Sequence, residues 1–305
     1  MTAVVKSFSV FDEHNQPGDM FYIKHSNSNF TIIDCCVVQE NQERICREIF
    51  NEMAGKDIVR FISTHPDEDH ICGLRYLDSE IAINNFYCVK NKATKQNASD
   101  SFKYYCKLRD NASLAFYLYK GCTRLWMNQD NENHYGSAEI NCLWPVLDNI
   151  AFKRELDLAA AGESYNNISP ILTCDVVENC RMMWMGDLEK EFIENIKYEV
   201  EWPKIDVLFA PHHGRDSGKL PEDILRALSP KLIVIGEAES EHLNYYRGYN
   251  TITQNSAGDI VLVCDCSRVD VYVSNSGYGG PSFLSVNFHH DASYGNYIGS
   301  LKLDC

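Results

Sequence analysis

Short apolar runs alternate along the chain with longer segments in which apolar residues recur three and four positions apart. The short runs predict β-strands at residues 4–11, 20–24, 30–38, 58–63, 140–146, 168–177, 182–185, 207–210, 232–235, 260–264, 269–273 and, in the tail, 283–288. The periodic segments predict helices at residues 40–54, 74–78, 100–120, 188–200 and 220–228, and residues 150–164 are expected to form a mobile loop or a short helix. This alternation predicts an α+β sandwich with two sheets inside and helices outside.

The predicted strand at residues 58–63 runs directly into a dense polar loop. Four residues of metal-binding types follow it in the order H-x-D-x-D-H, namely His65, Asp67, Asp69 and His70. Imidazole and carboxylate groups at this density are costly to bury unless something positive pairs with them. A divalent metal is the natural partner, because neutral imidazole and ionised carboxylate both bind Zn²⁺ or Mn²⁺. The alternative is a polar loop whose side chains cap the following helix.

This motif resembles the signature H-x-H-x-D-H of the metallo-β-lactamase superfamily. With Asp67 in place of the second histidine, it is similar to the branch that includes the soluble hydrolase domain of the competence DNA-uptake protein ComEC. The resemblance covers roughly residues 4–273, with its motifs in family order. It implies a metallo-β-lactamase fold for residues 1–278, an αββα sandwich of two central mixed sheets and outer helices. It further implies a basic helical insertion at about 90–124 and a C-terminal tail, 279–305, that packs on the domain or on a partner.

Other stretches carry the same resemblance. A Gly18-Asp19 turn precedes the second strand, and Asp34 ends the third. A later strand ends in Gly186-Asp187, where the resemblance implies that Asp187 bridges two metals, although taken alone this residue would be a helix N-cap.

A segment Pro211-His212-His213-Gly214 follows another strand and resembles the P-H-H-G segment of the ComEC-type branch. We expect His212 to bind metal, with His213 as the alternative ligand or as a group that supports the ligands or contacts the substrate. Ser217 stands in the region where the branch has Ser-x-x-Ser. Asn167, in an N-N-x-S segment, is the nearest polar residue to the place where commoner family members supply a histidine.

The resemblance implies metal-dependent hydrolysis at a site with two divalent ions. Its predicted ligands are His65, Asp67, Asp69, His70, Asp187 and His212. The expected ions are Zn²⁺ or Mn²⁺, with Mg²⁺ as a further candidate, because oxygen ligands favour the harder ions. The metals would lower the pKa of a shared water, and the resulting hydroxide would attack a phosphorus or carbonyl centre. Asp69 would orient or deprotonate the nucleophile, so Asp69 and Asp187 are the predicted catalytic residues.

Composition suggests a cytoplasmic protein. The 305 residues suffice for one large domain or two small ones, with 45% hydrophobic and 23% charged residues. The 13 cysteines show no repeated spacing, so we expect them to be reduced rather than paired in a secreted disulfide scaffold. Neither a signal peptide nor a membrane span is expected.

The charge distribution bears on the substrate. A net charge of −15 disfavours broad attraction to nucleic acid, yet residues 90–124 hold eight basic and two acidic residues among many aromatics. The aromatics could simply be core and the lysines a solvated face. Alternatively, the segment forms a basic lip, including Lys103 and Lys107, that guides a phosphate-bearing substrate. A phosphodiester, nucleic acid included, is the preferred substrate by family analogy.

Two other functions remain open at this point. One is hydrolysis of a small nucleotide or a lactone, which suits the acidic charge. The other is a non-catalytic, metal-stabilised binding or sensor protein, suggested by the missing third histidine. Four further histidines could complete the first metal site, namely His134, His242, His289 and His290. Substrate and oligomeric state are left open by the sequence.

Overall fold

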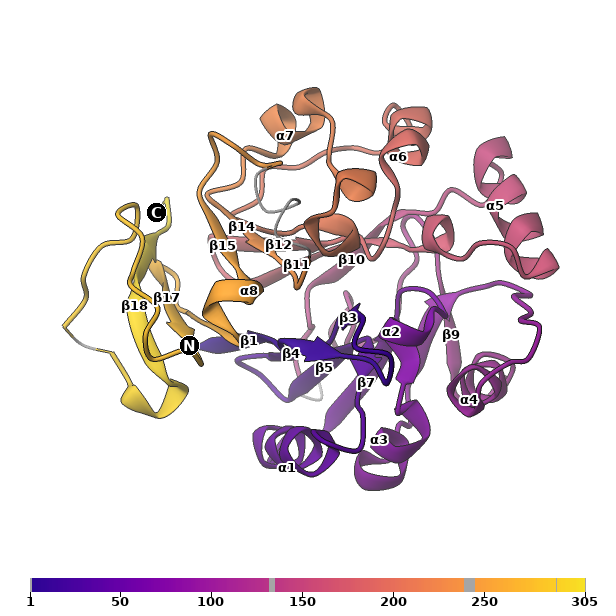
Figure 1. Cartoon of the computed structure of the whole chain (residues 1–305), viewed down its shortest axis with the longest axis horizontal. Helices are drawn as coiled ribbons and strands as arrows, with labels where there is room; N and C mark the ends of the chain where they lie inside the picture. The colour runs from indigo at the N-terminus through magenta and orange to yellow at the C-terminus, as the bar shows by residue number, and fades with distance from the viewer. Residues whose placement is uncertain (1, 132–134, 239–244, 289, 305) are drawn as a thin grey trace.

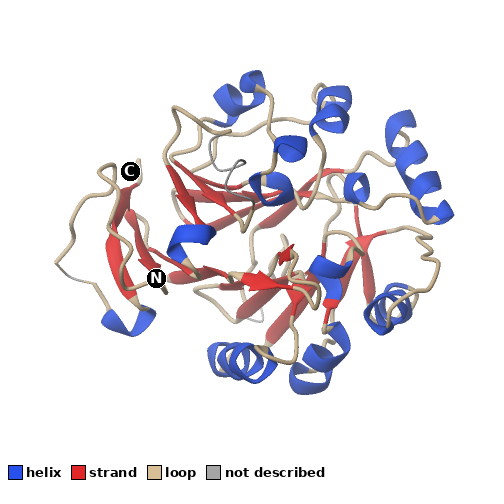
Figure 2. Cartoon of the chain, in the orientation of Figure 1, coloured by secondary structure: helices blue, strands red, loops and turns tan. Residues whose placement is uncertain are grey.

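The computed structural model describes residues 2–131, 135–238, 245–288 and 290–304, and two mixed β-sheets form its centre (Figures 1 and 2). The larger sheet has nine strands in the order β18 (Asn296–Lys302), β17 (Arg268–Val273), β16 (Ile260–Cys264), β1 (Ala3–Ser7), β4 (Phe21–Lys24), β5 (Asn29–Ile33), β7 (Ile58–Ser63), β8 (Phe86–Val89) and β9 (Ala115–Leu118). The smaller sheet has six strands in the order β10 (Ile140–Trp144), β11 (Ile171–Val177), β12 (Cys180–Trp184), β13 (Val207–Phe209), β14 (Leu232–Ile235) and β15 (Thr251–Thr253). Short strands β2 (Val10–Phe11) and β3 (Pro17–Gly18) pair with each other, and β6 (Cys35–Cys36) follows β5.

Helices cover the outer face of each sheet (Figure 1). On the nine-stranded sheet these are α1 (Gln42–Glu52), α3 (Leu74–Ile81) and α4 (Asp100–Arg109); on the six-stranded sheet they are α5 (Ile150–Ala161), α6 (Lys190–Ile196) and α7 (Glu222–Leu228). Two one-turn helices, α2 (Glu68–Ile71) and α8 (Gln254–Ala257), complete the set. The layers agree with the predicted α+β sandwich. Among the helices described, none combines the length and apolar character needed to cross a bilayer.

Aromatic side chains join the inner faces of the two sheets. The ring of Phe21 in β4 packs edge-on against Trp184 of β12 and Phe209 of β13, with centroids 6.4 and 5.1 Å apart. Trp184 and Phe209 stack on each other at 4.7 Å. Because such pairs bury large apolar area and favour defined ring geometries, they fix how the sheets face each other.

The motif strand β7 is central, and this explains its continuous apolar pattern. It pairs in parallel with β5 on one side and with β8 on the other, and Phe61 and Ile62 are buried. Parallel strands covered on both faces read as unbroken apolar runs. In the other sheet β12, β13 and β14 are also parallel. The carboxyl ends of these parallel strands carry the loops described below, which places polar residues from distant parts of the chain at one edge.

The predicted helix at 100–120 is wrong in its second half. The helix α4 ends at Arg109, and Ala115–Leu118 instead forms the edge strand β9 beside β8. The side chain of Asn111 accepts a hydrogen bond from the backbone N–H of Ser113 at 3.0 Å. Such local bonds compete with helix formation, and the aromatic residues that follow favour a strand.

The structure decides one open expectation in favour of a helix and corrects another in the tail. Residues 150–164 contain a three-turn helix, α5, whose N-cap Asn149 accepts a hydrogen bond from the Phe152 N–H. In the tail, residues 283–288 form only an isolated bridge, Ser285 to Ser300, and the strand is β18, which pairs with β17. Pattern reading missed β18 because Gly299 interrupts it, in a conformation (φ +134°) that side-chain-bearing residues rarely adopt.

Gly73 offers a test of how tightly the motif loop is packed. Gly73 and Gly55 both have left-handed φ values, +71° and +77°. A Cβ on Gly73 would lie 2.1 Å from the Val37 carbonyl oxygen, whereas one on Gly55 would meet nothing within 4 Å. We expect Gly55→Ala to lower the free energy of unfolding by about 1 kcal/mol, and Gly73→Ala by about 1–3 kcal/mol more, because a backbone segment must shift.

Urea unfolding followed by circular dichroism measures both variants, with Gly55→Ala as the matched control for backbone conformation. Equal losses of stability in the two variants would show that the close contact of Gly73 with Val37 does not prevent a larger residue at position 73.

Candidate metal centre

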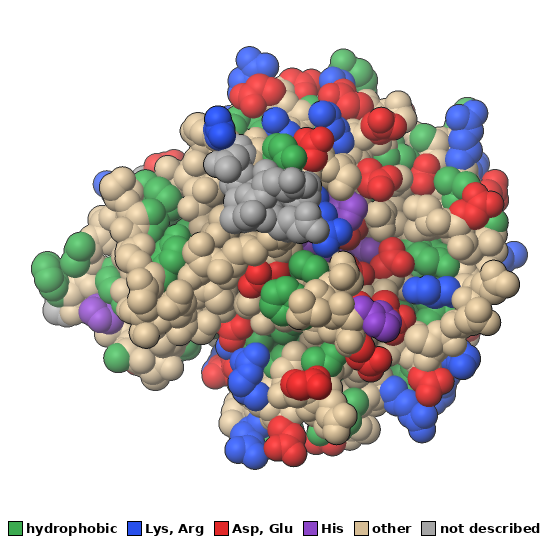
Figure 3. All heavy atoms as spheres, in the orientation of Figure 1, with side chains coloured by type: hydrophobic (Ala, Val, Ile, Leu, Met, Phe, Trp, Pro, Cys, Tyr) green, Lys and Arg blue, Asp and Glu red, His purple; other side chains and the backbone are tan. Residues whose placement is uncertain are grey.

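Loops from both sheets bring four buried side chains together between the layers. Asp19 follows β3, His70 lies in α2, Asp187 follows β12, and His213 lies in the 3-10 turn η2 (Pro211–Gly214). Each offers one ligand atom, and these atoms all lie within 4.8 Å of one another. On the face shown in Figure 3, histidine and acidic side chains lie side by side.

The polar atoms of this group approach one another without hydrogen-bonding. His70 Nε2 lies 3.2 Å from Asp187 Oδ1, and His213 Nδ1 lies 3.2 Å from Asp19 Oδ1. His213 Nε2 is 3.4 Å from Asp69 Oδ2 and 3.6 Å from Asp187 Oδ2. Yet His70 Nε2, Asp187 Oδ1 and both ring nitrogens of His213 have no hydrogen-bond partner among the described residues. Buried polar atoms are rarely left so, and this set of nitrogen and carboxylate donors fits a divalent metal ion.

A second group adjoins this cluster. His65 Nε2 is 3.5 Å from Asp67 Oδ2, and the rings of His65 and His70 are 4.1 Å apart. His212 Nε2 lies 3.6 Å from Asp187 Oδ2. His65 Nε2 is again buried without a hydrogen-bond partner among the described residues. The two groups therefore meet at Asp187.

Neighbouring side chains hold the Nδ1 atoms of His65, His70 and His212. Asp34 Oδ2 lies 2.9 Å from His70 Nδ1, and Asp34 also accepts hydrogen bonds from the N–H and hydroxyl of Thr64. Ser169 Oγ is 3.3 Å from His65 Nδ1, and Ser217 Oγ is 2.9 Å from His212 Nδ1. Partners of this kind fix ring orientation and leave Nε2 for the site, as they do for metal-binding histidines generally.

Backbone geometry brings the strand ends together. His212 and His213 both have positive φ, 51° and 55°, and Gly214 follows at 84°. The left-handed region costs a non-glycine residue about 1–2 kcal/mol, so two in succession mark a site whose surroundings hold it. The N–H of His212 donates to the carbonyl of Gly186 at 3.0 Å, which ties this turn to the loop carrying Asp187.

Asp19 is held by close backbone packing on the motif loop. Its N–H donates to the carbonyl of Asp69 at 3.1 Å. A Cβ on Gly18 would lie 2.5 Å from Cys36 Sγ and 2.7 Å from the Asp69 carbonyl oxygen. Only glycine fits this approach, which explains the Gly-Asp order of the turn.

The structure brings the six predicted ligands, His65, Asp67, Asp69, His70, Asp187 and His212, into these two adjoining groups. The buried four-residue cluster, however, contains His213 and not the preferred His212. Asp19 was missed as a candidate ligand. The sequence predicts a turn at Gly18-Asp19, but only the fold shows that Asp19 reaches His213.

The predicted supporting residues have other partners. Asn167 donates to Glu189 and Glu155 at 3.0 and 3.2 Å, so it braces the loop after Asp187, and Ser169 contacts His65 in its stead. Ser217 does support His212.

Lys103 and Lys107 lie on the outer helix α4. Lys103 Nζ is 3.3 Å from Asp100, and Lys107 Nζ lies over the ring of Tyr104. Both line a hollow of about 520 Å³ that, among the described residues, includes no member of the cluster. Of the basic segment, Lys95 is the residue that approaches the motif loop, 3.9 Å from Glu68.

Of the four further histidines, His290 lies among the described residues, and it does not belong to the cluster. His290 is exposed, and its ring stacks on Tyr297 at 4.2 Å. His134, His242 and His289 lie outside the described residues.

The carboxylates dominate the electrostatics of the cluster. Burial alone would lower the pKa of His70 and His213, but Asp187 and Asp69 hold the pKa of His70 well above its usual range, and Asp19 and Asp187 raise that of His213 to about 10. Burial would raise the pKa of Asp69, but His70 and His213 lower it to about 2. Without a metal, protons on the two histidines therefore balance the carboxylates.

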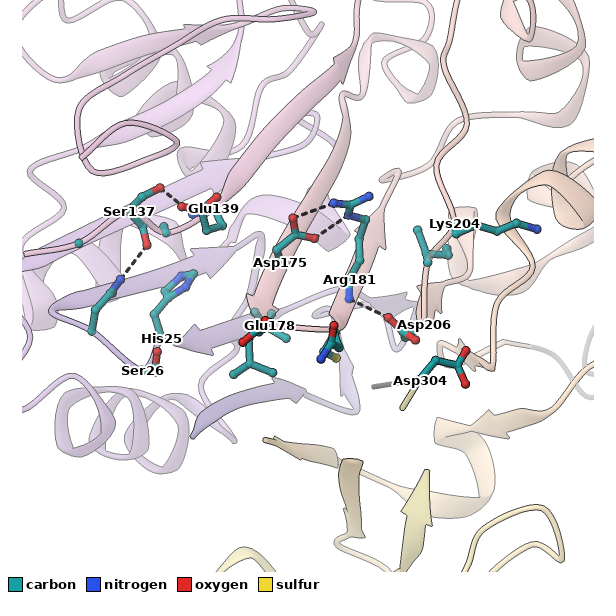
Figure 4. A pocket seen from close by; sticks show the side chains of 18 of the residues that line it. His25, Ser26, Ser137, Glu139, Asp175, Glu178, Arg181, Lys204, Asp206 and Asp304 are labelled. Carbon is teal, nitrogen blue, oxygen red and sulfur yellow. Dashed lines mark hydrogen bonds and ion pairs between the residues drawn. The ribbon is translucent and has the colours of Figure 1, made fainter. Parts of the chain in front are cut away.

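A wide cavity lies elsewhere (Figure 4). It measures about 1100 Å³, and its lining includes His25, Lys204 and an ion pair in which Arg181 donates to Asp175 at 2.8 Å. None of the cluster residues lines it. Comparison of the chain with protein-family models and with curated proteins gives no match.

The raised pKa values predict that metal binding releases protons. At pH 7 a divalent ion that binds to the metal-free protein should displace about two protons, from His70 and His213. Both folded-state pKa values exceed the unfolded value of about 6.5. The stabilisation from these protonated pairs is therefore complete below pH 6.5 and is lost as the pH rises through about 10 for His213. Metal affinity should rise over the same window.

Isothermal titration calorimetry with Mn²⁺ or Zn²⁺, in buffers of different protonation enthalpy, counts the released protons. The exposed His290 supplies the control, since His290→Gln should release the same number. A binding enthalpy that does not depend on the buffer would contradict the prediction.

Proposed function

We propose that the protein is a metal-dependent hydrolase of the metallo-β-lactamase fold that cleaves phosphodiesters. The observation that carries the proposal is the convergence of buried imidazole nitrogens and carboxylate oxygens that lack hydrogen-bond partners among the described residues. The order of the motifs, with His65 to His70 first, Asp187 next and His212-His213 last, supports the resemblance to the ComEC-type hydrolase domain. Two mixed sheets between helical layers suit the same fold.

We infer two ions, Zn²⁺ or Mn²⁺, with Mg²⁺ as a further candidate. His65, Asp67 and His212 would hold one, Asp19, Asp69, His70 and His213 the other, and Asp187 would be shared. When bound, such ions lower the pKa of a water and stabilise negative charge at the reacting centre.

The carboxylates of the chain then divide the remaining work. The side chain of Asp69 is 22% exposed and that of Asp187 only 4%, so Asp69 can reach a water at the mouth of the site whereas Asp187 cannot. The lowered pKa of Asp69 keeps it ionised at neutral pH. Asp69 would accept a hydrogen bond from the attacking water and orient it.

A short substrate is the second candidate, and two observations favour it over long DNA. The net charge of −15 repels polyanions. The lysines expected to guide nucleic acid, Lys103 and Lys107, line a hollow on α4 that contains none of the described cluster residues. Hydrolysis of a dinucleotide or another small nucleotide ester fits this arrangement.

The test is hydrolysis by metal-stripped protein resupplied with Mn²⁺, Zn²⁺ or Mg²⁺. Substrates are bis(p-nitrophenyl) phosphate, a dinucleotide, and single- and double-stranded DNA. We expect turnover that requires metal and that falls by a factor of about 10³ in Asp187→Asn, because the shared carboxylate is lost.

Asp57→Asn is the matched control, since Asp57 is exposed and makes no contact with the cluster. Metal content is measured for every variant. Stoichiometric metal uptake with no cleavage of any ester would sink the hydrolase proposal and favour a binding protein.

A further inference from the structure

Arg215 is a cation without a partner beside the candidate metal centre. It follows η2 and precedes the 3-10 turn η3 (Asp216–Gly218). Among the residues that the structure describes, its guanidinium makes no hydrogen bond or ion pair, and its Nε is buried with no acceptor. The residue as a whole is half-buried, so the donor left without an acceptor is the Nε N–H, one of the five that a guanidinium carries.

Arg215 directly follows the turn η2 that carries His212 and His213, and its N–H donates to the carbonyl of His212 at 2.9 Å. His212 in turn places Nε2 3.6 Å from Asp187, so Arg215 starts from the turn that delivers this part of the centre. The side chain of His212 is 13% exposed, which makes this side reachable from solvent.

The backbone of Arg215 is fixed on both sides. Its N–H donates to the carbonyl of His212 at 2.9 Å, and its carbonyl accepts from Gly218 at 3.0 Å. A Cβ on Gly218 would lie 2.4 Å from the Pro211 carbonyl oxygen, so the turn closes tightly on η2. A side chain presented from such a turn starts from a defined position.

The absence of a carboxylate partner is informative in so acidic a site. Asp67, Asp69 and Asp187 lie in the same centre, yet none is within 4 Å of the guanidinium. Lys95, close to the motif loop, and Lys231, just before β14, do have acidic partners among the described residues. The acceptor that Arg215 lacks among the described residues is therefore expected from a ligand.

We infer that Arg215 binds a non-bridging oxygen of the substrate phosphate and thereby selects an anionic ester over a neutral one, an inference that rests on the proposed hydrolase function. The planar guanidinium matches two phosphate oxygens at once, and charge-assisted bonds of this kind are short and strong. Arg215 thus sets the substrate class, because a neutral lactone or triester offers no charge to it.

The test compares two esters with the same leaving group on the metal-loaded protein. Bis(p-nitrophenyl) phosphate is an anion, and diethyl p-nitrophenyl phosphate is neutral. Arg215→Gln should lower kcat/KM for the anion by about 10- to 100-fold and change it for the neutral ester by less than about twofold. Arg215→Lys should recover part of the loss, because lysine keeps the positive charge but lacks the paired N–H donors of the guanidinium.

Arg47→Gln is the matched control, on the exposed face of α1, and should leave both rates unchanged. Metal content and thermal unfolding of each variant exclude a folding defect. Equal losses for both esters, or no loss for the anion, would overturn the inference.

Binding of inorganic phosphate to the metal-loaded protein, measured by titration calorimetry, separates this inference from the proposed function. Arg215→Gln should weaken phosphate binding about tenfold or more even if no ester is cleaved. If the wild type cleaves nothing, the hydrolase proposal fails while the phosphate measurement still decides the role of Arg215. Phosphate that binds equally well to both proteins, or to neither, refutes that role.

Discussion

Buried carboxylates that need a positive partner are the constraint on which the centre of this molecule depends. Asp187 is almost fully buried, and one of its oxygens has no hydrogen bond among the described residues. Burial of an unpaired carboxylate costs on the order of several kcal/mol, so a cation must be present beside Asp187. Protons on His70 and His213 can fill this role, and so can a metal ion. The exchange of one for the other links the chemistry of the site to the stability of the fold.

The two most buried aspartates of the centre show how residues that support a ligand differ from residues that could be one. Asp34 accepts hydrogen bonds from the N–H and hydroxyl of Thr64 and contacts His70 Nδ1, so the protein itself satisfies it. The carboxylate of Asp187 lies 3.2–3.6 Å from the Nε2 atoms of His70, His212 and His213. Its Oδ1 has no hydrogen-bond partner among the described residues. The aspartate at position 34 thus orients the ring of a histidine, whereas the aspartate at position 187 leaves a carboxylate oxygen available to bind a metal.

The hydrophobic pattern of the sequence was sufficient to predict elements that depend on local sequence. The strand before the motif and the strands at 232–235 and 260–264 have the predicted bounds, because parallel and central strands read as unbroken apolar runs. The pattern was insufficient where tertiary contacts determine which residues meet or where a strand forms. Asp19 reaches His213 only because two sheets meet, the choice between His212 and His213 depends on two left-handed residues, and β18 forms around a glycine. None of these has a signature in spacing or periodicity.

The charges of the chain act over two distances, at long range through the net charge and at contact range through single side chains. The contrast between the two narrows the class of substrate. At long range a net charge of −15 disfavours a polyanion, and salt does not reverse its sign. At contact range the guanidinium of Arg215 lacks an acidic partner among the described residues, and bound metal would add further positive charge beside it. Attraction confined to a few ångströms favours a compact phosphate ester whose charge is concentrated at the reacting group. An acidic surface and a cationic site are therefore compatible, because each acts over a different distance.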